Sequence, residues 1–312
     1  MRRFLAALLA AAALLTVPAL ALTDGEMDAA ADEAARAAIA VCVDDGMTDL
    51  EKLTVLHDWL ALHCDYGATL RGDTPYGALA EGTAVCRGYA SGYARLAALA
   101  GLDGADTYSE ALDHAWILVT LDGGRYFSDC TWDDGKNQKL GLIRHTYFLF
   151  DAMNALSIGH YGWDSPEVVT GGALEYAPWL SSVTRVIFDG DSAYYIDGDF
   201  CLWRCDRSTW ETERLFMLDD RWPVEEGVRH ELYTGLILVR GRLYFNTPYE
   251  IRYYDLRTGE VRTALTPDTS ERLLYGVAER DGTLCYSQAG SSGDLTYDIV
   301  DTGISLRGAW GY

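Results

Sequence analysis

Basic residues are scarce in this chain of 312 residues: 25 lysines and arginines stand against 47 aspartates and glutamates, and the formal net charge is -22. Nucleic-acid binding needs a basic face that replaces the counterions of the phosphates. The composition therefore argues against nucleic acid as the main partner, and equally against an anionic membrane surface. With 49% hydrophobic and 23% charged residues, the chain is typical of a folded globular protein, and its length predicts two domains.

Long apolar runs are missing after residue 21. Residues 1–21 themselves resemble a secretory signal peptide: two arginines open the segment, residues 5–17 are apolar, and Ala19 and Ala21 mark a cleavage site. An apolar run of about 13 residues is too short to span a bilayer as a helix. We therefore expect a secreted or extracytoplasmic mature protein without stable membrane insertion. An uncleaved N-terminal anchor is the alternative.

Cysteine pairs with CxxC spacing are absent, which leaves no common zinc motif, and no metal site is expected. The seven cysteines occupy positions 42, 64, 86, 130, 201, 205 and 285. In an exported protein they can form disulfides. Because their number is odd, at least one thiol stays free or pairs between chains.

Helical patterns occupy the first third of the chain. An alanine-rich stretch at 26–43 predicts an N-terminal helix. Thr48 and Glu51 form a capping box, in which each side chain can satisfy a free backbone N–H at the start of a second helix. A further helix should begin near Cys86 and end at Gly101.

A hairpin follows these helices. Strands are predicted at 111–121 and 124–130, because the Asp-Gly sequence at 122–123 is a strong signal for a two-residue turn. Helix followed by sheet makes residues 46–170 a domain of α+β class, preceded by a helical segment at 22–45.

From residue 180 onward, short strand-like runs alternate with Gly, Asp and Asn turns. Three stretches look alike: 185–206, 236–261 and 274–303. Their spacing is that of propeller blades, although three blades fall short of a closed propeller. Residues 180–312 are therefore predicted to form an all-β accessory domain, built either of propeller-like blades or as a small sandwich. It is either a separate docking domain or part of one core with the preceding domain.

Cys86 has a chemical signature. In the phrase GTAVCRGYA a loop precedes it and a helix follows, so the cysteine should lie at a helix N-terminus. Free N–H groups and the helix dipole stabilise a thiolate there and lower the thiol pKa, which makes the sulfur a nucleophile toward carbonyl carbon. A small buried hydrophobic cysteine is the alternative reading.

His114 and Asp129 come from the predicted hairpin. A two-residue turn pairs Leu121 with Gly124. His114 then lies opposite Thr131, and Asp129 is its diagonal neighbour on the same face, within reach of the imidazole. A nucleophilic thiol, a base and an orienting carboxylate are the groups that acyl transfer needs.

These residues occur in phrases that resemble the transglutaminase-like domain of the papain-like cysteine peptidase and transglutaminase superfamily. The phrases are LHDWLALHCDY (56–66), PYGALAEGTAVCRGYA (75–90), DHAWILVTLDGGRYFSDCTWDD (113–134) and YFLF…HYGW (147–163). The resemblance implies that Cys86 is the nucleophile, His114 the general base and Asp129 the orienting carboxylate. It also implies cleavage of amide bonds through a thioester, by hydrolysis or amide transfer, without metal or organic cofactor.

Other side chains receive weaker assignments. Tyr76 is a candidate oxyanion donor, although a buried structural role is favoured for it, and Trp116 is expected beside the triad. The carboxylates at 133 and 134 are expected to cap a turn rather than bind calcium. The remaining histidines are expected on the surface or in packing, at positions 57, 63 and 145. By resemblance, His160 and Trp163 cover one end of the cleft.

Two functions follow from these observations. The first is a secreted cysteine-dependent hydrolase or acyl transferase that acts on a protein or peptide, at the cell surface, with the β domain for docking. The second is a non-catalytic extracellular protein that keeps the fold and binds peptide or glycan. The complete set of three catalytic candidates favours the first.

Overall fold

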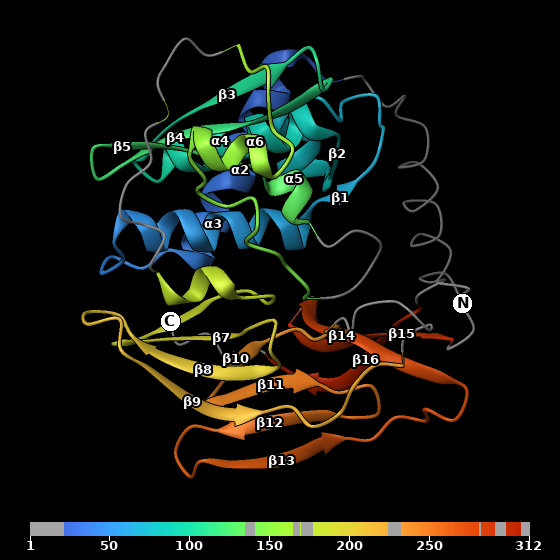
Figure 1. Cartoon of the computed structure of the whole chain (residues 1–312). Coiled ribbons are helices and arrows are strands. Elements are labelled where there is room, and N and C mark those ends of the chain that lie inside the picture. Colours follow the sequence, from blue (N-terminus) through green and yellow to red (C-terminus); the bar gives the residue numbers. More distant parts are fainter. Residues whose placement is uncertain are drawn as a thin grey trace, which may run out of the picture.

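The computed structural model describes residues 22–134, 141–164, 169, 177–223, 232–280, 282–290 and 298–306. Two parts lie one above the other in Figure 1: a helix-and-sheet part that extends to α6, and a strand-rich part from β6 onward. The expected signal peptide falls outside the described residues. Within them, no helix is both long enough and apolar enough to cross a membrane.

Three helices of the first part lie close to where the sequence predicts them, and two short helices do not follow from it. Its α-helices are α2 (Asp24–Cys42), α3 (Asp49–His63), α4 (Cys86–Leu99), α5 (Cys130–Asp133) and α6 (Ala152–Ser157), and a π-helical turn covers Gly77–Glu81. The capping box of Thr48 and Glu51 is present at the start of α3, and Thr23 and Glu26 form a second one at α2. Reciprocal bonds of this kind satisfy backbone N–H groups that a helix start leaves free.

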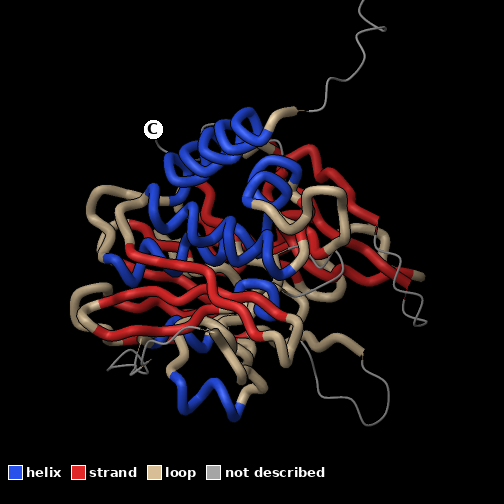
Figure 2. Tube along the Cα trace, turned by 90° about the horizontal axis from the view of Figure 1, so that it is seen from above, coloured by secondary structure: helices blue, strands red, loops and turns tan. Residues whose placement is uncertain are grey.

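A three-stranded antiparallel sheet forms the second layer of this part. Its strands are β3 (Asp103–Ser109), β4 (His114–Leu121) and β5 (Gly124–Ser128), in that order, and the short strands β1 (Asp65–Tyr66) and β2 (Thr83–Ala84) pair in parallel elsewhere. Helix α4 contacts β3 and β4, and it also packs against α2 and α3 (Figures 1 and 2). The sheet therefore holds the start of β4 close to the helix that begins with Cys86.

The predicted hairpin register is confirmed. Leu121 pairs with Gly124, and the ladder runs back to the pair of Ile117 and Ser128. The turn residues at 122 and 123 have φ angles of 49° and 77°, which is the conformation that a two-residue turn of this type needs.

The end of the second strand differs from the prediction. Strand β5 stops at Ser128, and the chain turns at once into helix α5, so Thr131 does not lie opposite His114. The side chain of Asp129 causes this turn, because it accepts hydrogen bonds from the N–H groups of Thr131 and Trp132 as a helix N-cap. The strand-like residue pattern at 124–130 gave no sign that Asp129 would instead cap a helix.

Three antiparallel sheets make up the strand-rich part, one for each of the similar stretches of sequence. The first holds β6 (Ile187–Asp189), β7 (Ser192–Ile196), β8 (Cys201–Asp206) and β9 (Thr212–Met217). The second holds β10 (Ile237–Val239), β11 (Arg242–Asn246), β12 (Ile251–Asp255) and β13 (Glu260–Leu265). The third holds β14 (Arg272–Arg280), β15 (Thr283–Gly290) and β16 (Asp298–Ser305). Each is a meander of consecutive strands; whether they act as propeller-like blades stays a prediction.

One hydrophobic cluster joins the two parts. Alongside leucines of α3 and tyrosines of α4, it contains Trp179, Val186 and Tyr195 from the beginning of the strand-rich part. Trp179 and Val186 are each 1% exposed. The first sheet of the strand-rich part therefore packs on the helix-and-sheet part through a shared core.

Candidate active site

Cys86 is the first residue of α4, and its side chain is half-buried. The helix has no side-chain cap, so its first N–H groups remain available. The loop before the helix approaches closely, because the Val85 N–H donates to the Gly72 carbonyl at 2.8 Å. Gly88 permits this approach: a Cβ at that position would lie 2.3 Å from the same carbonyl oxygen. The expected placement of Cys86 at a helix N-terminus is therefore found.

His114 and Asp129 meet directly. The Nε2 atom of His114 lies 2.6 Å from Oδ2 of Asp129, and the two residues are 7% and 1% exposed. Oδ1 of Asp129 accepts the two N-cap hydrogen bonds, so both oxygens are held in place. The carboxylate thus keeps one fixed oxygen toward the imidazole.

His114 acts on the Cys86 thiol and lowers its pKa. Because Nε2 faces Asp129, the ring nitrogen left for the thiol is Nδ1. Partial burial works to raise the pKa of the thiol, but the hydrogen bonds from His114 and from the Ala115 N–H outweigh it, and the pKa of Cys86 is lowered. In the same way burial opposes a charge on His114, yet its bonds to Asp129 and Cys86 raise its pKa to about 9. These shifts favour a thiolate–imidazolium pair.

The other cysteines behave differently. All seven cysteines are free thiols in the structure. Burial raises the thiol pKa of Cys42 and Cys64 to about 12 and that of Cys205 to about 11, and it raises the pKa of Cys130 as well. Among the thiols with a resolved shift, Cys86 alone has a lowered pKa. Fast reaction with electrophiles is therefore expected at this position.

A second histidine contacts the carboxylate. Nε2 of His160 lies 2.8 Å from Oδ2 of Asp129, and His160 is fully buried. Sequence reasoning placed His160 at one end of the cleft but not on Asp129, because the two residues are 31 positions apart and only the fold brings them together.

Aromatic rings surround this group. The Trp132 ring stacks on His114 with centroids 5.0 Å apart, and Trp116 lies 5.8 Å from the same ring. Both tryptophans also contact His160. Trp116 is 1% exposed, so it packs beside the triad as expected. The rings exclude water from the imidazole–carboxylate contact, which strengthens its electrostatic interaction.

Tyr76 has a different environment. It lies partly buried against the main hydrophobic cluster, at the start of the π-helical turn, with the Arg71 guanidinium 5.6 Å from its ring centroid. This environment agrees with the structural role that the sequence favours, and the oxyanion role stays a prediction. Asp133 and Asp134, which are predicted to cap a turn, bind more distant groups. Asp133 accepts hydrogen bonds from the Tyr147 N–H, and Asp134 accepts one from the Tyr89 hydroxyl.

His57 and His145 are not surface residues. They are 0% and 5% exposed, and both contact the carboxylate of Asp58. His63 stacks on Trp59 with centroids 4.5 Å apart. The paired HD sequence at 57–58 was the only available signal for the buried cluster, and it does not reveal the partner from 87 residues away.

Among the residues that the structure describes, two groups bring donor atoms close enough for a metal ion, and each has an aspartate between two histidines. They are His57, Asp58 and His145, and His114, Asp129 and His160. In both groups one carboxylate oxygen already lies within hydrogen-bond distance of both imidazoles. Hydrogen bonding accounts for the short distances, and we assign no metal to either group.

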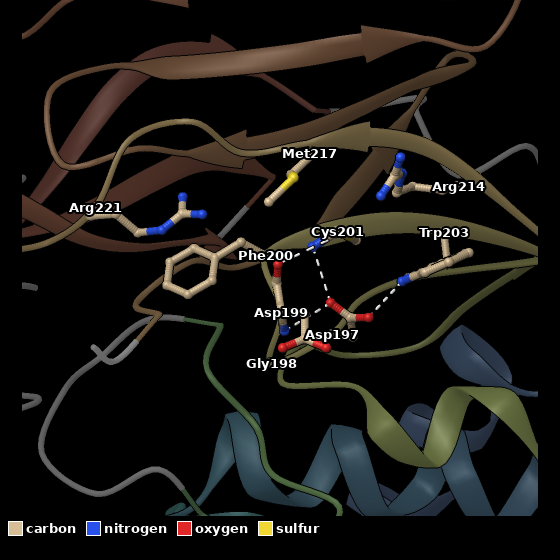
Figure 3. Close-up of a pocket in the computed structure, with 9 residues that line it drawn as sticks. All are labelled: Asp197, Gly198, Asp199, Phe200, Cys201, Trp203, Arg214, Met217 and Arg221. Atoms are coloured by element: carbon tan, nitrogen blue, oxygen red, sulfur yellow. Dashed lines mark hydrogen bonds between the residues drawn. The ribbon is translucent and has the colours of Figure 1, made fainter. Parts of the chain in front are cut away.

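A cavity of about 520 Å³ lies in the strand-rich part, around the start of β8 (Figure 3). Phe200, Trp203 and Arg221 line it, and the Asp197 carboxylate in its wall accepts a hydrogen bond from the Trp203 indole N–H at 2.6 Å. None of the three catalytic candidates lines this cavity. It therefore plays no part in the thiol chemistry argued below.

None of the family models matches the chain, and none of the curated proteins does. A TGase crystal structure is similar, with 17% identity and a TM-score of 0.33 over 43% of this chain and 39% of that one. A candidate cysteine protease from Cytophaga hutchinsonii has 18% identity and a TM-score of 0.28 over 37% and 45% of the two chains. The designed Ika4 protein has 12% identity and a TM-score of 0.25 over 60% and 86%.

The chain spans less than half of the length of the TGase and of the Cytophaga protein. Because TM-scores this low do not establish a shared fold, the function rests on the geometry of the site itself.

Proposed function

We propose that this chain is a cysteine-dependent hydrolase of amide bonds with a transglutaminase-like catalytic core. The observation that carries the proposal is the 2.6 Å contact of the His114 imidazole with the buried Asp129 carboxylate. Cys86 stands at the start of α4, and His114 lowers the pKa of its thiol. A cysteine that merely fills space has no use for a base oriented by a buried carboxylate.

Acylation begins from the thiolate–imidazolium pair. The sulfur of Cys86 attacks the carbonyl carbon of the substrate amide, and the carbonyl oxygen becomes an oxyanion. The free N–H groups at the start of α4 are suited to donate hydrogen bonds to that oxygen. His114 then gives its proton to the leaving amine, the C–N bond breaks, and the acyl group remains on sulfur as a thioester.

Deacylation uses the same groups in reverse. Neutral His114 takes a proton from a water molecule that attacks the thioester. The C–S bond breaks, the carboxylic acid leaves, and Cys86 returns as a thiolate beside an imidazolium. An amine in place of water would give amide transfer. We propose hydrolysis because Cys86 is only half-buried and water is the most abundant acceptor.

The proposal can be tested with two generic probes. Iodoacetamide should alkylate Cys86 faster than the other thiols below the ordinary thiol pKa of about 8.5, as mapped by mass spectrometry. p-Nitrophenyl acetate should release a burst of nitrophenolate, with one acetyl group found on Cys86. Cys86→Ser is the control of similar volume for both.

The absence of selective alkylation and of the burst would overturn the enzyme proposal. It would favour the non-catalytic protein that binds peptide or glycan. We further propose that the mature enzyme is secreted and acts on protein or peptide at the cell surface, which cell fractionation and N-terminal sequencing of the mature chain would check.

A further inference from the structure

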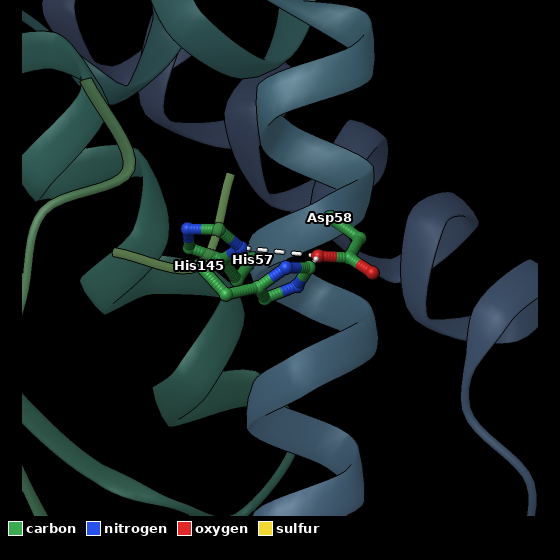
Figure 4. A group of neighbouring side chains, drawn as sticks. All are labelled: His57, Asp58 and His145. Carbon is green, nitrogen blue, oxygen red and sulfur yellow. Dashed lines mark hydrogen bonds and ion pairs between the residues drawn. The ribbon is translucent and has the colours of Figure 1, made fainter. Parts of the chain in front are cut away.

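His57 and Asp58 of α3 form a second buried His–Asp–His group with His145 (Figure 4). Oδ1 of Asp58, on α3, lies 3.1 Å from Nδ1 of His57 and 2.8 Å from Nε2 of His145. Its other oxygen accepts the Val186 N–H at 2.7 Å, and Nδ1 of His145 lies 3.0 Å from the Ser182 carbonyl oxygen. Ser182 and Val186 lie at the entry to the strand-rich part, so this buried group joins it to α3.

The partners of this group are other buried charged or polar groups. Nδ1 of His145 lies within hydrogen-bond distance of the Ser182 carbonyl oxygen, and its Nε2 faces the Asp58 carboxylate. Each ring nitrogen of His57 faces a carboxylate, because its Nε2 lies 3.3 Å from Oδ2 of Asp133 in an ion pair without hydrogen-bond geometry. Burial opposes a charge on His57, but Asp133 and Asp58 raise its pKa to about 9. Removing a partner would leave a buried charge unpaired.

The far end of this chain of contacts reaches the active site. Asp133 is the last residue of α5, and Asp129 caps its first turn. The backbone of Tyr147 holds both ends: its carbonyl accepts the Asp129 N–H at 2.7 Å, and its N–H donates to the Asp133 carboxylate at 3.0 Å. The thiol of Cys130, between them, donates to the His57 carbonyl at 3.4 Å.

We propose that the buried chain His145–Asp58–His57–Asp133 positions Asp129, so that the strand-rich part supports the catalytic triad in addition to any docking role. These are positioning residues, because they act on the reaction only through Asp129 and His114. The inference rests on the proposed function in that it assigns the triad its catalytic role.

The geometry of α5 explains why the position of Asp129 depends on Asp133. The helix is a single turn of four residues, too short to hold its own shape without tertiary contacts. Its ion pair to His57 and its two bonds to Tyr147 supply those contacts. A small shift of the turn would lengthen the 2.6 Å contact of Asp129 with His114, and displacements of about 1 Å in a catalytic group are known to be costly to rate.

A second ion pair between the two parts provides a matched control. Arg207 of the strand-rich part binds Glu51 of α3 through Nε and Nη2, each 2.7 Å from a carboxylate oxygen. Glu51 is 2% exposed, so this pair is also largely buried, and the hydrogen bonds of the Glu51 carboxylate go to Thr48 and Arg207. Arg207→Gln should lower stability without disturbing the triad.

The experiment compares Asp133→Asn, His145→Gln and Arg207→Gln in the full chain. Asp133→Asn keeps an oxygen for the Tyr147 N–H but removes the charge that faces His57. His145→Gln keeps a donor toward Asp58 but breaks the bond to the Ser182 carbonyl. We expect both to slow acetylation of Cys86 by p-nitrophenyl acetate by about tenfold. Both should also move the pH midpoint of its alkylation by iodoacetamide upward, because a displaced Asp129 stabilises the imidazolium less.

Arg207→Gln should keep the wild-type acetylation rate and alkylation midpoint although its melting temperature falls. Near-UV circular dichroism identifies the variants that remain folded. If Asp133→Asn or His145→Gln does not fold, Asp58→Asn replaces it, because its side-chain oxygen can still accept the Val186 N–H. Unchanged rates and midpoints in folded variants would overturn the inference. An equal loss of acetylation rate in Arg207→Gln would also overturn it. So would a lower rate in Asp133→Asn together with an unchanged rate in His145→Gln. Slow, unselective alkylation of wild-type Cys86 would instead overturn the proposed function.

Discussion

The Nε2–H of His160 lies 2.8 Å from Oδ2 of Asp129, the same oxygen that faces His114. Nδ1 of His160 is buried and has no hydrogen-bond partner among the described residues. Because a carboxylate oxygen only accepts, Nε2 of His160 is the donor in this contact. Oδ2 of Asp129 is thus held by His160 as well as by His114.

Replacing His160 should slow acylation of Cys86 only where the new side chain cannot donate a hydrogen bond to Asp129. His160→Leu removes the bond to Asp129, and we expect about a tenfold lower rate with p-nitrophenyl acetate. His160→Gln can place an amide N–H near the position of Nε2 and should stay within about threefold of the wild type. If the two variants were equally slow, the packing of the ring would matter and its hydrogen bond would not.

The three catalytic candidates should respond differently to substitution. Cys86→Ala and His114→Ala should abolish nitrophenolate turnover, because they remove bond formation and proton transfer. Asp129→Asn should leave a residual rate roughly 10³–10⁴-fold below the wild type, since an amide orients His114 in the wrong tautomer. Its Oδ1 can still accept the N-cap bonds of α5, so the variant should fold. Full activity in Cys86→Ala would show that another residue is the nucleophile.

Stability should fall as the pH rises above neutrality. The pKa of His57 is raised to about 9 in the folded protein: burial opposes the charge, but Asp133 and Asp58 together outweigh it. The stabilisation is therefore complete below the unfolded pKa of about 6.5 and is lost as the pH rises through about 9. Urea unfolding midpoints measured from pH 6 to pH 10 should decrease across this window. His57→Gln should flatten the decrease, and an equally steep curve in that variant would assign it to other groups.

A chain that ends at residue 172 should not fold into a stable, active protein. It would lose Trp179 and Val186 from the shared core, and it would leave Asp58 and Glu51 without their partners from the strand-rich part. Buried charges without partners are strongly destabilising. Expression, size-exclusion chromatography and circular dichroism of this truncation test the expectation. A folded truncation with normal turnover of p-nitrophenyl acetate would instead favour a separate docking domain.

Local signals in the sequence determined much of the first part. The capping box of Thr48 and Glu51 marks the start of α3, and the Asp-Gly turn at 122–123 sets the register that brings His114 toward Asp129. Such signals are readable because each depends on residues two to four positions apart. Cys86 at the start of α4 belongs to the same class, since the switch from loop to helix is visible in the residues around it.

Tertiary structure alone decided what surrounds these residues. His160 reaches Asp129 across 31 positions, His145 reaches Asp58 across 87, and Val186 reaches Asp58 across 128. No local propensity encodes such pairs, because a buried charge can be balanced by any partner that the fold delivers. The sequence by itself therefore determined the triad candidates and the elements that bear them. Only the packing of the strand-rich part against α3 decided which charges are buried together. The same packing decided which contacts are proposed to position Asp129.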